Sequence, residues 1–574
     1  MGWNERQPVP CEKEALTGRP QSRAQQYQAW RDRPLRHTTK RHGSGTMTGA
    51  MSKRGGATGE QEWEAFTEAF TRQIPRGLDT RFLKTQRLPQ ARWQSPAVVR
   101  EREVLAYDPA KPGAKILVGA LHDKLIGIAD NRHVLTVAGS RAGKSVTVIN
   151  NLFFYRGSVL ATDPKAELAS KTALARAALG QKVYVLDPFG YASEGAAPFR
   201  AAYNPLAILE LESPTIIEDA GLIADGLVVT TGQEKDPHWD ESARNFIEGL
   251  ILHVATAPRY AGRRTLLTVR DLINAALTPV PGDDDDDPET AVERDMLANA
   301  ERLARAEDTA DIGAAIEGAA RDFYEKGSNE QAGVLSTVRR HTKFLDYRAM
   351  RAVLGGGDFS LADLKRDPAG VTIYLCLPAT RMGSCSRWLR IFINQLLDAM
   401  EREKAQPPAP VLVCLDEFPV LGFMRQLQDA AGQIASFDVR LWVILQDWGQ
   451  GKALYGDRWE SFAANAGLLQ FFGNSDVTTT EYIAKKLGKT RVGVVREGEV
   501  APEQQEHGLT GRTEATELHD LLSPDEVSRL FARSDSFKRQ LVIWAGFDPM
   551  ILQRVEYFDR ESAHYQWFAG ASMG

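Results

Sequence analysis

The stretch HVLTVAGSRAGKSVTVI, residues 133–149, decides the fold. HVLTVAG is predicted to form a strand that ends near Val137, and the helical pattern of KSVTVINNLFFY begins at Lys144. The loop between them matches the phosphate-binding pattern G-x-x-x-x-G-K-[ST] except at its first position, which is Ala138. A strand, a loop of this kind and a helix in succession predict a nucleotide-binding unit in a parallel α/β sheet.

The loop is predicted to bind ATP through its backbone and through two side chains. Backbone N–H groups at a helix N-terminus can point at a polyphosphate. Gly143 permits close approach, Lys144 would reach the β- and γ-phosphates, and the Ser145 hydroxyl would hold Mg²⁺. Ala138 lacks the freedom of glycine at positive φ, which its neighbour can supply. The predicted nucleotide contacts are Ala138, Gly139, Ser140, Arg141, Ala142, Gly143, Lys144 and Ser145.

A second site lies far along the chain, where the apolar strand VLVCL (411–415) is followed by Asp416 and Glu417. A P-loop ATPase needs a carboxylate at such a strand end for the water shell of Mg²⁺. A second carboxylate polarises the attacking water. Two adjacent acids closing an apolar strand are costly unless they are used. We therefore predict that Asp416 holds Mg²⁺ together with Ser145 and that Glu417 is the catalytic carboxylate.

Other predicted strands also end in polar residues. Gln446 closes LWVILQ (441–446); in RecA-like motors a polar residue at this place senses the γ-phosphate, although an ordinary strand-end glutamine is the alternative. Asp163 and Asp187 end strands at the edge where ligands bind in parallel sheets. Each precedes a proline, so each is either a ligand-binding residue or the residue that holds its own turn.

The order of the predicted elements indicates the fold class. Strands alternate with crossover helices around the loop, then a long run rich in Ala, Leu, Glu and Arg has helical spacing and almost no strand signal, and strands return at GVTIYLCLP (370–378). We predict an α/β, RecA-like P-loop fold with a parallel-rich twisted sheet and an inserted all-α domain. The expected divisions are a disordered basic leader (1–58), a helical linker region (59–110), the first half of the nucleotide-binding domain (111–210), the all-α domain (211–345), and the second half with the C-terminal segment (346–574).

Composition sets limits on partners and location. The 574 residues carry a formal net charge of −5, but residues 1–55 hold eleven Lys or Arg and four Asp or Glu. Contact with a polyanion is therefore expected through a local patch, a channel lining or the leader. The sequence has four cysteines without a C-x-x-C pattern and no apolar run long enough to span a membrane. Met51 begins a stretch that could be an alternative start.

These residues and several longer blocks resemble the coupling ATPases of type IV secretion and conjugative DNA transfer, the TraG/TraD type. The resemblance covers roughly residues 110–560. An alanine at the first loop position is familiar from this family. The matching blocks are AGSRAGKSV, GSVLATDPKAEL, LGQKVYVLDPFG, YNPLA, DPHWDESARNFI, LDEFPVLG, ILQDWGQGKALYG, FFGNSDVTTTEYIAKKLG and LLSPDEVSRL.

The resemblance implies a homo-hexameric ring that uses ATP and Mg²⁺ at subunit interfaces. The cargo would be single-stranded DNA bound to a relaxase, or an effector protein, recruited by the all-α domain and delivered to type IV channel components at the inner membrane. The expected location is cytoplasmic and peripheral to that membrane. Many family members begin with membrane-spanning helices, and this chain departs from that pattern.

The arginine finger is the second departure from the family. Some relatives carry an arginine eleven residues before the sensor glutamine, and that position here is Ala435. Arg440 and Arg425 are the substitutes, and we expect Arg440 to serve in catalysis unless it only flanks its strand. Two other functions stay open: a double-stranded DNA translocase of the FtsK or HerA type, and a nucleotide-gated cargo receptor with little turnover.

Overall fold

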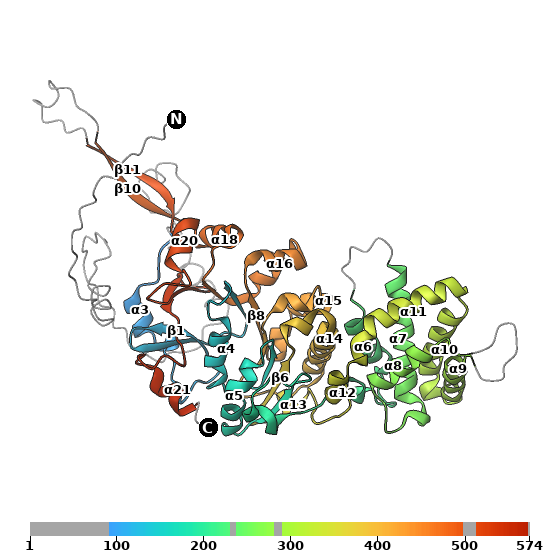
Figure 1. Cartoon of the computed structure of the whole chain (residues 1–574). Helices are drawn as coiled ribbons and strands as arrows, with labels where there is room; N and C mark the ends of the chain where they lie inside the picture. The colour runs from blue at the N-terminus through green and yellow to red at the C-terminus, as the bar shows by residue number, and fades with distance from the viewer. Residues whose placement is uncertain (1–90, 230–236, 280–289, 498–511, 572–574) are drawn as a thin grey trace, which may run out of the picture. The chain divides into compact units, whose positions relative to one another are not determined.

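The structure is a computed structural model that describes residues 91–229, 237–279, 290–497 and 512–571. The expected basic leader, and the helix that the spacing of aromatic residues predicts near 60–74, lie outside these ranges. The fold belongs to the class expected from the sequence: a large, mostly parallel sheet is covered by helices, and further helices are inserted between two of its strands (Figure 1).

The sheet has eleven strands in the order β2-β1-β13-β12-β9-β3-β8-β7-β4-β6-β5. The seven strands from β9 to β5 run parallel to one another, and the four at the other edge pair antiparallel. The strands are β1 Ile116–Leu121, β2 Lys124–Ile128, β3 His133–Ala138, β4 Val159–Asp163, β5 Lys182–Leu186, β6 Val371–Cys376, β7 Val411–Leu415, β8 Val439–Leu445, β9 Ala466–Phe472, β12 Arg539–Trp544 and β13 Met550–Gln553.

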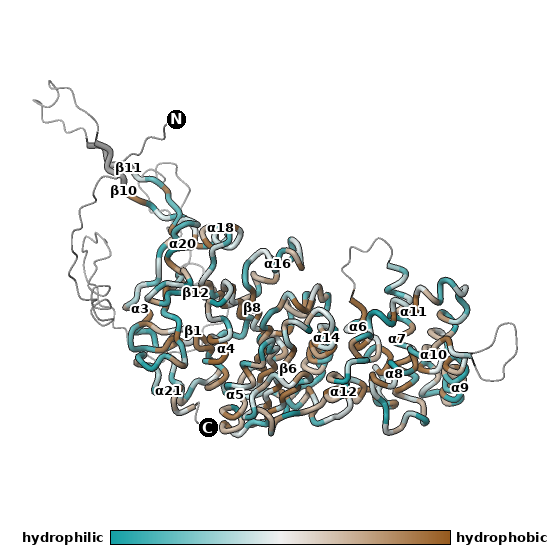
Figure 2. The backbone as a smooth tube through the Cα atoms, in the orientation of Figure 1, coloured by the Kyte–Doolittle hydropathy of each residue, from teal (hydrophilic) through white to brown (hydrophobic). Residues whose placement is uncertain are grey.

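The parallel strands are buried because helices cover both faces of the sheet. Alternate residues of β7 join different cores: Leu412 and Cys414 pack with residues of α4 and α5, whereas Val413 and Leu415 pack with residues of α14. Figure 2 shows the apolar colouring concentrated around β6 and β8. The helices that flank the sheet or follow its strands are α3 Pro96–Glu101, α4 Lys144–Leu152, α5 Glu167–Ala178, α14 Ala379–Arg402, α15 Arg425–Ala430, α16 Trp448–Tyr455, α17 Arg458–Ala464, α18 Val477–Leu487, α20 Pro524–Leu530 and α21 Tyr565–Ala571.

Local sequence predicted part of the antiparallel edge. The local pattern predicts two short strands around the turn at 122–123 in AKILVGALHDKLIGIAD, which the structure has as β1 and β2. It also predicts a strand in RQLVIWAG, which the structure has as β12. No local pattern predicted β13 or a separate hairpin of β10 (Lys489–Glu497) and β11 (Arg512–Asp520). These hairpin strands mix charged and apolar residues, so they lack the continuous apolar run that identified the central strands.

Helices fill the interval between β5 and β6, where the described residues form no strand. Their apolar residues recur at helical spacing, and α7 packs against α6, α10 and α11. None of the helices in the described ranges is both long and apolar enough to span a membrane. The inserted helices are α6 Ile216–Leu227, α7 His238–Thr256, α8 Leu266–Ala275, α9 Ala291–Ala304, α10 Ala310–Tyr324, α11 Ser328–Thr342, α12 Arg348–Leu354 and α13 Asp363–Arg366.

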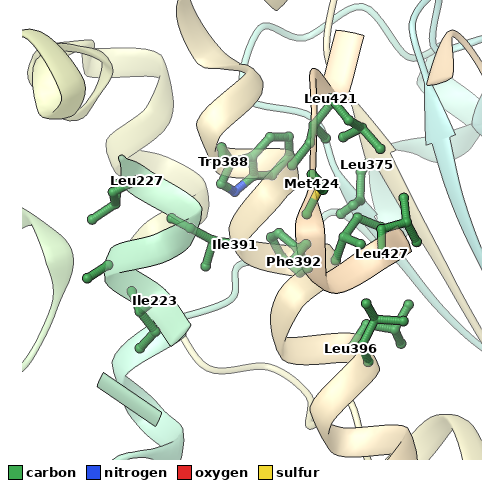
Figure 3. Close-up of a cluster of buried hydrophobic side chains, with 14 of the residues drawn as sticks. Ile223, Leu227, Leu375, Trp388, Ile391, Phe392, Leu396, Leu421, Met424 and Leu427 are labelled. Carbon is green, nitrogen blue, oxygen red and sulfur yellow. The ribbon is translucent and has the colours of Figure 1, made fainter. Parts of the chain in front are cut away.

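The inserted helices join the sheet through α6 and α14. Figure 3 shows Ile223 and Leu227 of α6 facing Ile391 of α14, with Phe392 on the side toward the sheet. Gly226 allows this approach, because a Cβ there would lie 2.8 Å from Cγ1 of Ile391. The continuous apolar packing makes α14 a shared wall between the sheet and the inserted helices.

A buried polar cluster holds the inserted helices together. His253 of α7 is fully buried, and its Nε2 lies 3.0 Å from Oδ2 of Asp295 on α9. The hydroxyl of Tyr260 donates to the same oxygen at 2.7 Å, and Arg259 lies 2.8 Å from the other. Burial by itself would raise the pKa of Asp295, but these three partners outweigh it and hold the pKa well below its ordinary 3.8.

Replacing Asp295 by Ala is expected to lower the free energy of unfolding by about 3 kcal/mol, because the charged acceptor is lost and a buried histidine is left without its partner. A depressed pKa stabilises the fold above the ordinary pKa and loses that contribution as pH falls towards the folded value. The variant should therefore show a flatter fall in stability below about pH 5 in denaturant titrations. Glu301→Ala on the same helix, which removes an exposed pair with Arg305, is the control and should cost under about 0.5 kcal/mol.

Candidate nucleotide-binding site

The loop between β3 and α4 has the backbone shape of a phosphate cradle. Gly143 is in the left-handed region with φ 102° and caps α4, which begins at Lys144. Arg141 also has a positive φ of 56°. The first N–H groups of a helix have no partner within the helix, so α4 presents donors and a positive dipole end to an anion. A polyphosphate is therefore well matched to this position.

Ala138 occupies the first motif position without strain. It is the last residue of β3 and stays in the sheet, paired with Phe472 of β9, so no positive φ is required there. Its methyl group is fully buried together with Ala142 and Phe472. The alanine is thus a packing residue, and its effect on the cradle is through the backbone.

Gly139 is the residue that must be glycine. A Cβ at this position would lie 2.0 Å from the carbonyl oxygen of Gly473. Its N–H donates to the carbonyl of Phe472 at 3.2 Å, and its carbonyl accepts from the N–H of Ala142 at 3.2 Å. The N–H groups of Gly139 and Ala142 therefore bond within the protein and are not available to a phosphate.

Lys144 points across the cradle. Its Nζ donates to the carbonyl of Ala138 at 3.0 Å and approaches that of Gly139 at 3.5 Å. Burial lowers the pKa of Lys144, and the nearby carboxylates of Glu417 and Asp416 oppose that shift. The lysine is thus a cation with only neutral oxygens as direct partners, and phosphate oxygens would be stronger acceptors at the same place.

Asp416 follows β7 directly and is 8% exposed. Its Oδ2 lies 3.5 Å from the Ser145 hydroxyl, and its carbonyl accepts from the Thr162 hydroxyl at 2.9 Å. Burial, aided by the charge of Glu417, raises the pKa of Asp416 to about 6. Two oxygen ligands side by side fit Mg²⁺, which takes one or two protein oxygens and completes its shell with phosphates and water. No cluster of three or more His, Cys, Asp or Glu side chains that could hold a metal occurs among the described residues.

Glu417 has its carboxylate held in place. The residue is in the left-handed region with φ 56°, which turns the chain sharply after β7. The side-chain amide of Gln446 lies 3.2 Å from both carboxylate oxygens. Gln446 is fixed in turn, because its N–H donates to Oε1 of Gln450 at 2.9 Å and its carbonyl accepts from Asn474 at 3.4 Å. The carboxylate can act as a base for a water beside a bound γ-phosphate.

The structure corrects the expectation for Arg440. It is the second residue of β8, so it lies at the opposite end of that strand from Gln446. It is 2% exposed and donates to the carbonyl of Ala114 at 3.0 Å. The side chain is thus buried within its own chain and lies away from the edge of the sheet that carries Asp416, Glu417 and Gln446. Arg425, the weaker substitute, is exposed at the start of α15 and lies 3.6 Å from Asp429.

Asp163 and Asp187 hold their own turns. Asp163 accepts from the N–H groups of Glu167 at 3.0 Å and Ala169 at 2.9 Å, and burial raises the pKa of its carboxyl to about 7. Asp187 accepts from the N–H of Ala192 at 2.8 Å. The hydrogen bonds of both acids are those expected of residues that hold their own turns.

Three residues that support the site had no local signal in the sequence. Arg554, after β13, donates to the carbonyl of Ala142 at 2.6 Å and lies over the ring of Phe472, 5.3 Å from its centre. Thr162 and Asn474 hold the backbones of Asp416 and Gln446, as described above. All three contacts join residues that are far apart in the chain, and the order of the strands in the sheet brings these residues together.

The chain is similar in sequence to proteins of conjugative DNA transfer. The family model described as "Type IV secretory system Conjugative DNA transfer" matches residues 96–568. A conjugal transfer protein TraG of Escherichia coli is 26% identical over 414 residues, which are 69% of this chain and 62% of the relative. This chain thus spans less than two thirds of that relative's length.

Two solved structures share the fold. The bacterial conjugative coupling protein TrwBdeltaN70, in its unbound monoclinic form, has a TM-score of 0.56 and 15% identity, with 83% of this chain and 96% of that one covered. The plasmid coupling protein TrwB in complex with ADP and Mg²⁺ has a TM-score of 0.52 and 15% identity, with 82% and 96% covered. The RecA-like fold expected from the sequence is therefore confirmed.

Proposed function

The chain belongs to the type IV secretory system conjugative DNA transfer family, and from this premise we propose that it is an ATP-driven coupling protein. It recruits relaxase-bound single-stranded DNA, an effector protein, or both, and delivers them to a type IV secretion channel. The observation that carries the proposal is the contact of Glu417 with Gln446 next to the phosphate cradle and Asp416. This set of groups suits ATP turnover rather than nucleotide binding alone.

The residues divide the chemistry among them. The N–H groups at the start of α4 and Lys144 bind the phosphates, and Ser145 with Asp416 would hold Mg²⁺. Mg²⁺ at that place would neutralise charge on the phosphates. Glu417 accepts the proton of the attacking water, and Gln446 keeps its carboxylate oriented. The TrwB structure with ADP and Mg²⁺ supports this choice of nucleotide and metal.

The partners follow from the family. We assign cargo recruitment to the inserted helices of residues 211–345, which share the wall of α14 with the nucleotide-binding domain. The working assembly is a homo-hexamer with ATP bound between subunits, placed at the cytoplasmic face of the inner membrane beside the channel. A residue of the neighbouring copy other than Arg440 would supply the positive charge at the phosphates, since charge on a transferring phosphoryl group is commonly stabilised by an arginine from a neighbour.

The test is ATP hydrolysis by the purified chain with single-stranded, double-stranded or no DNA, combined with mass photometry. We expect the specific activity to rise with protein concentration, together with the hexamer population, and to rise further with single-stranded DNA. A preference for double-stranded DNA would favour a translocase of the FtsK or HerA type. Activity indifferent to both DNA and concentration would favour a cargo receptor and would count against the proposal.

A further inference from the structure

The segment that follows Glu417 is held by a buried arginine. Glu417 leads directly into the 3-10 helix η8, Phe418–Leu421, which ends at Gly422 with φ 67°. On either side of this glycine, the carbonyls of Leu421 and Phe423 both accept from Nη1 of Arg390, at 2.8 and 2.7 Å. One guanidinium nitrogen thus holds the two carbonyls that flank Gly422, a few residues beyond the catalytic carboxylate.

Arg390 lies on α14 and is 4% exposed. Burial lowers the pKa of its guanidinium to about 10, which still leaves it charged at neutral pH. Its hydrogen-bond partners among the described residues are neutral carbonyls, and its Nε is buried without a partner. Burying a cation without a carboxylate beside it is costly. The hydrogen bonds of Arg390 must therefore provide something that an apolar residue of similar size could not, namely the fixed position of the two carbonyls.

Aromatic rings pack against the first residue of η8 and against the residue after Gly422. Phe418 stacks on Tyr455 of α16, with ring centres 5.9 Å apart, and lies 5.9 Å from Phe462 of α17. Phe423 lies 5.5 Å from the same Tyr455. Gln446, which contacts Glu417, is followed in the chain by α16. The ring of Tyr455 that packs on Phe418 therefore belongs to the same segment as this partner of Glu417.

We propose that Arg390 is a positioning residue for ATP hydrolysis. By holding the carbonyls of Leu421 and Phe423, it anchors the end of η8 and keeps the backbone of Glu417 at the angle that meets Gln446. The inference rests on the proposed ATPase function. A displacement of about 1 Å in a catalytic group can cost about 10²-fold in rate, so a clamp at this place bears on turnover.

The chain offers a matched control on the same helix. Arg387 lies three residues earlier on α14, but its Nε and Nη2 lie 3.3 and 3.2 Å from Nδ1 of His341 on α11. It is also partly buried and has a lowered pKa, first because of burial and then because of Arg340. Arg387 therefore matches Arg390 in chemistry and helix position while contacting the inserted helices in place of η8.

The experiment compares Arg390→Met, Arg390→Lys, Arg387→Met and Glu417→Gln with the wild type. We measure kcat and KM for ATP, the affinity for a fluorescent non-hydrolysable ATP analogue, and the melting temperature. Arg390→Met should lower kcat by about 10–100-fold while analogue affinity stays within about twofold. Arg390→Lys, which keeps the charge, should recover part of the loss, and Arg387→Met should keep kcat within about twofold.

A single-turnover cycle tests whether Arg390 acts through Glu417. If it does, Arg390→Met in the Glu417→Gln background should cause no further loss. A further loss of about tenfold, a wild-type kcat in Arg390→Met, or an equal fall in kcat, affinity and melting temperature would each overturn the inference. If Arg390→Met does not fold, Arg390→Lys decides in the same way: kcat lowered about 3–10-fold at unchanged affinity supports the clamp, and wild-type kcat refutes it.

The two proposals fail differently. A wild-type chain that hydrolyses no ATP, or a Glu417→Gln variant with full activity, would remove the proposed function and this inference together. An active wild type, an inactive Glu417→Gln and an unaffected Arg390→Met would remove only the role of Arg390.

Discussion

Replacing Glu417 by Gln is expected to lower kcat for ATP hydrolysis by about 10³-fold while ATP still binds. The amide has nearly the same shape but cannot accept a proton from water. The phosphate cradle and Lys144 are untouched by the change, so binding of a labelled ATP analogue should stay within about twofold. Phosphate release measures the first quantity, and analogue titration the second.

Two further variants serve as a second test of the site and as a control. Lys144→Ala should abolish hydrolysis and also weaken nucleotide binding, because it removes the cation that faces the phosphates. Asp187→Asn makes the same acid-to-amide change at the end of β5 and should leave kcat within about twofold, because Asp187 accepts from the N–H of Ala192 and contacts neither Glu417 nor Gln446. Wild-type-like hydrolysis in Glu417→Gln or Lys144→Ala would show that the site is wrongly assigned.

The adjacent residues Ala138 and Gly139 are expected to respond in opposite ways to a methyl group. Gly139→Ala puts a Cβ 2.0 Å from the carbonyl oxygen of Gly473, so β3 and the loop after β9 must move apart. We expect a loss of about 1–3 kcal/mol in the free energy of unfolding and a fall of at least about tenfold in ATP affinity. Thermal unfolding with and without ATP, together with analogue titration, measures both.

Ala138→Gly is the matched control, since it restores the residue that the general motif prefers. It removes a buried methyl group and adds chain freedom, at a cost of about 1 kcal/mol in stability. ATP affinity should stay within about twofold, because the strand backbone at 138 needs no positive φ. Improved ATP affinity in Ala138→Gly would contradict the view that Ala138 acts only through packing.

The local motifs were readable because their residues are neighbours in the chain. A strand, a glycine-containing loop and a helix place Lys144 and Ser145 correctly in any parallel sheet. The position of Asp416 and Glu417, which follow an apolar strand, is likewise predictable, because the carboxyl ends of parallel strands lie at one edge of the sheet. Gln446 was found by the same rule, and its contact with Glu417 follows from strands β7 and β8 being adjacent.

Strand direction explains the misplaced arginine. Arg440 and Gln446 flank the same strand, and closeness in sequence made Arg440 look available to the site. A strand separates its two ends by about 3.3 Å per residue, so the start of β8 lies on the far edge of the sheet. Arg440 is buried there against the carbonyl of Ala114, which precedes β1. This contact joins distant parts of the chain, so the residues around Arg440 do not predict it.

The residues that can bind phosphate, bind a metal or accept a proton are identifiable from the chain, because these reactions need particular side chains in a fixed local order. How firmly those residues are held depends on the folded protein. Three contacts join residues that are far apart in the chain: Gly139 with Gly473, Arg554 with Ala142, and Arg390 with Leu421 of η8. Such contacts depend on strand order and helix packing, which arise from burial of the whole core and leave no pattern in a short stretch of residues.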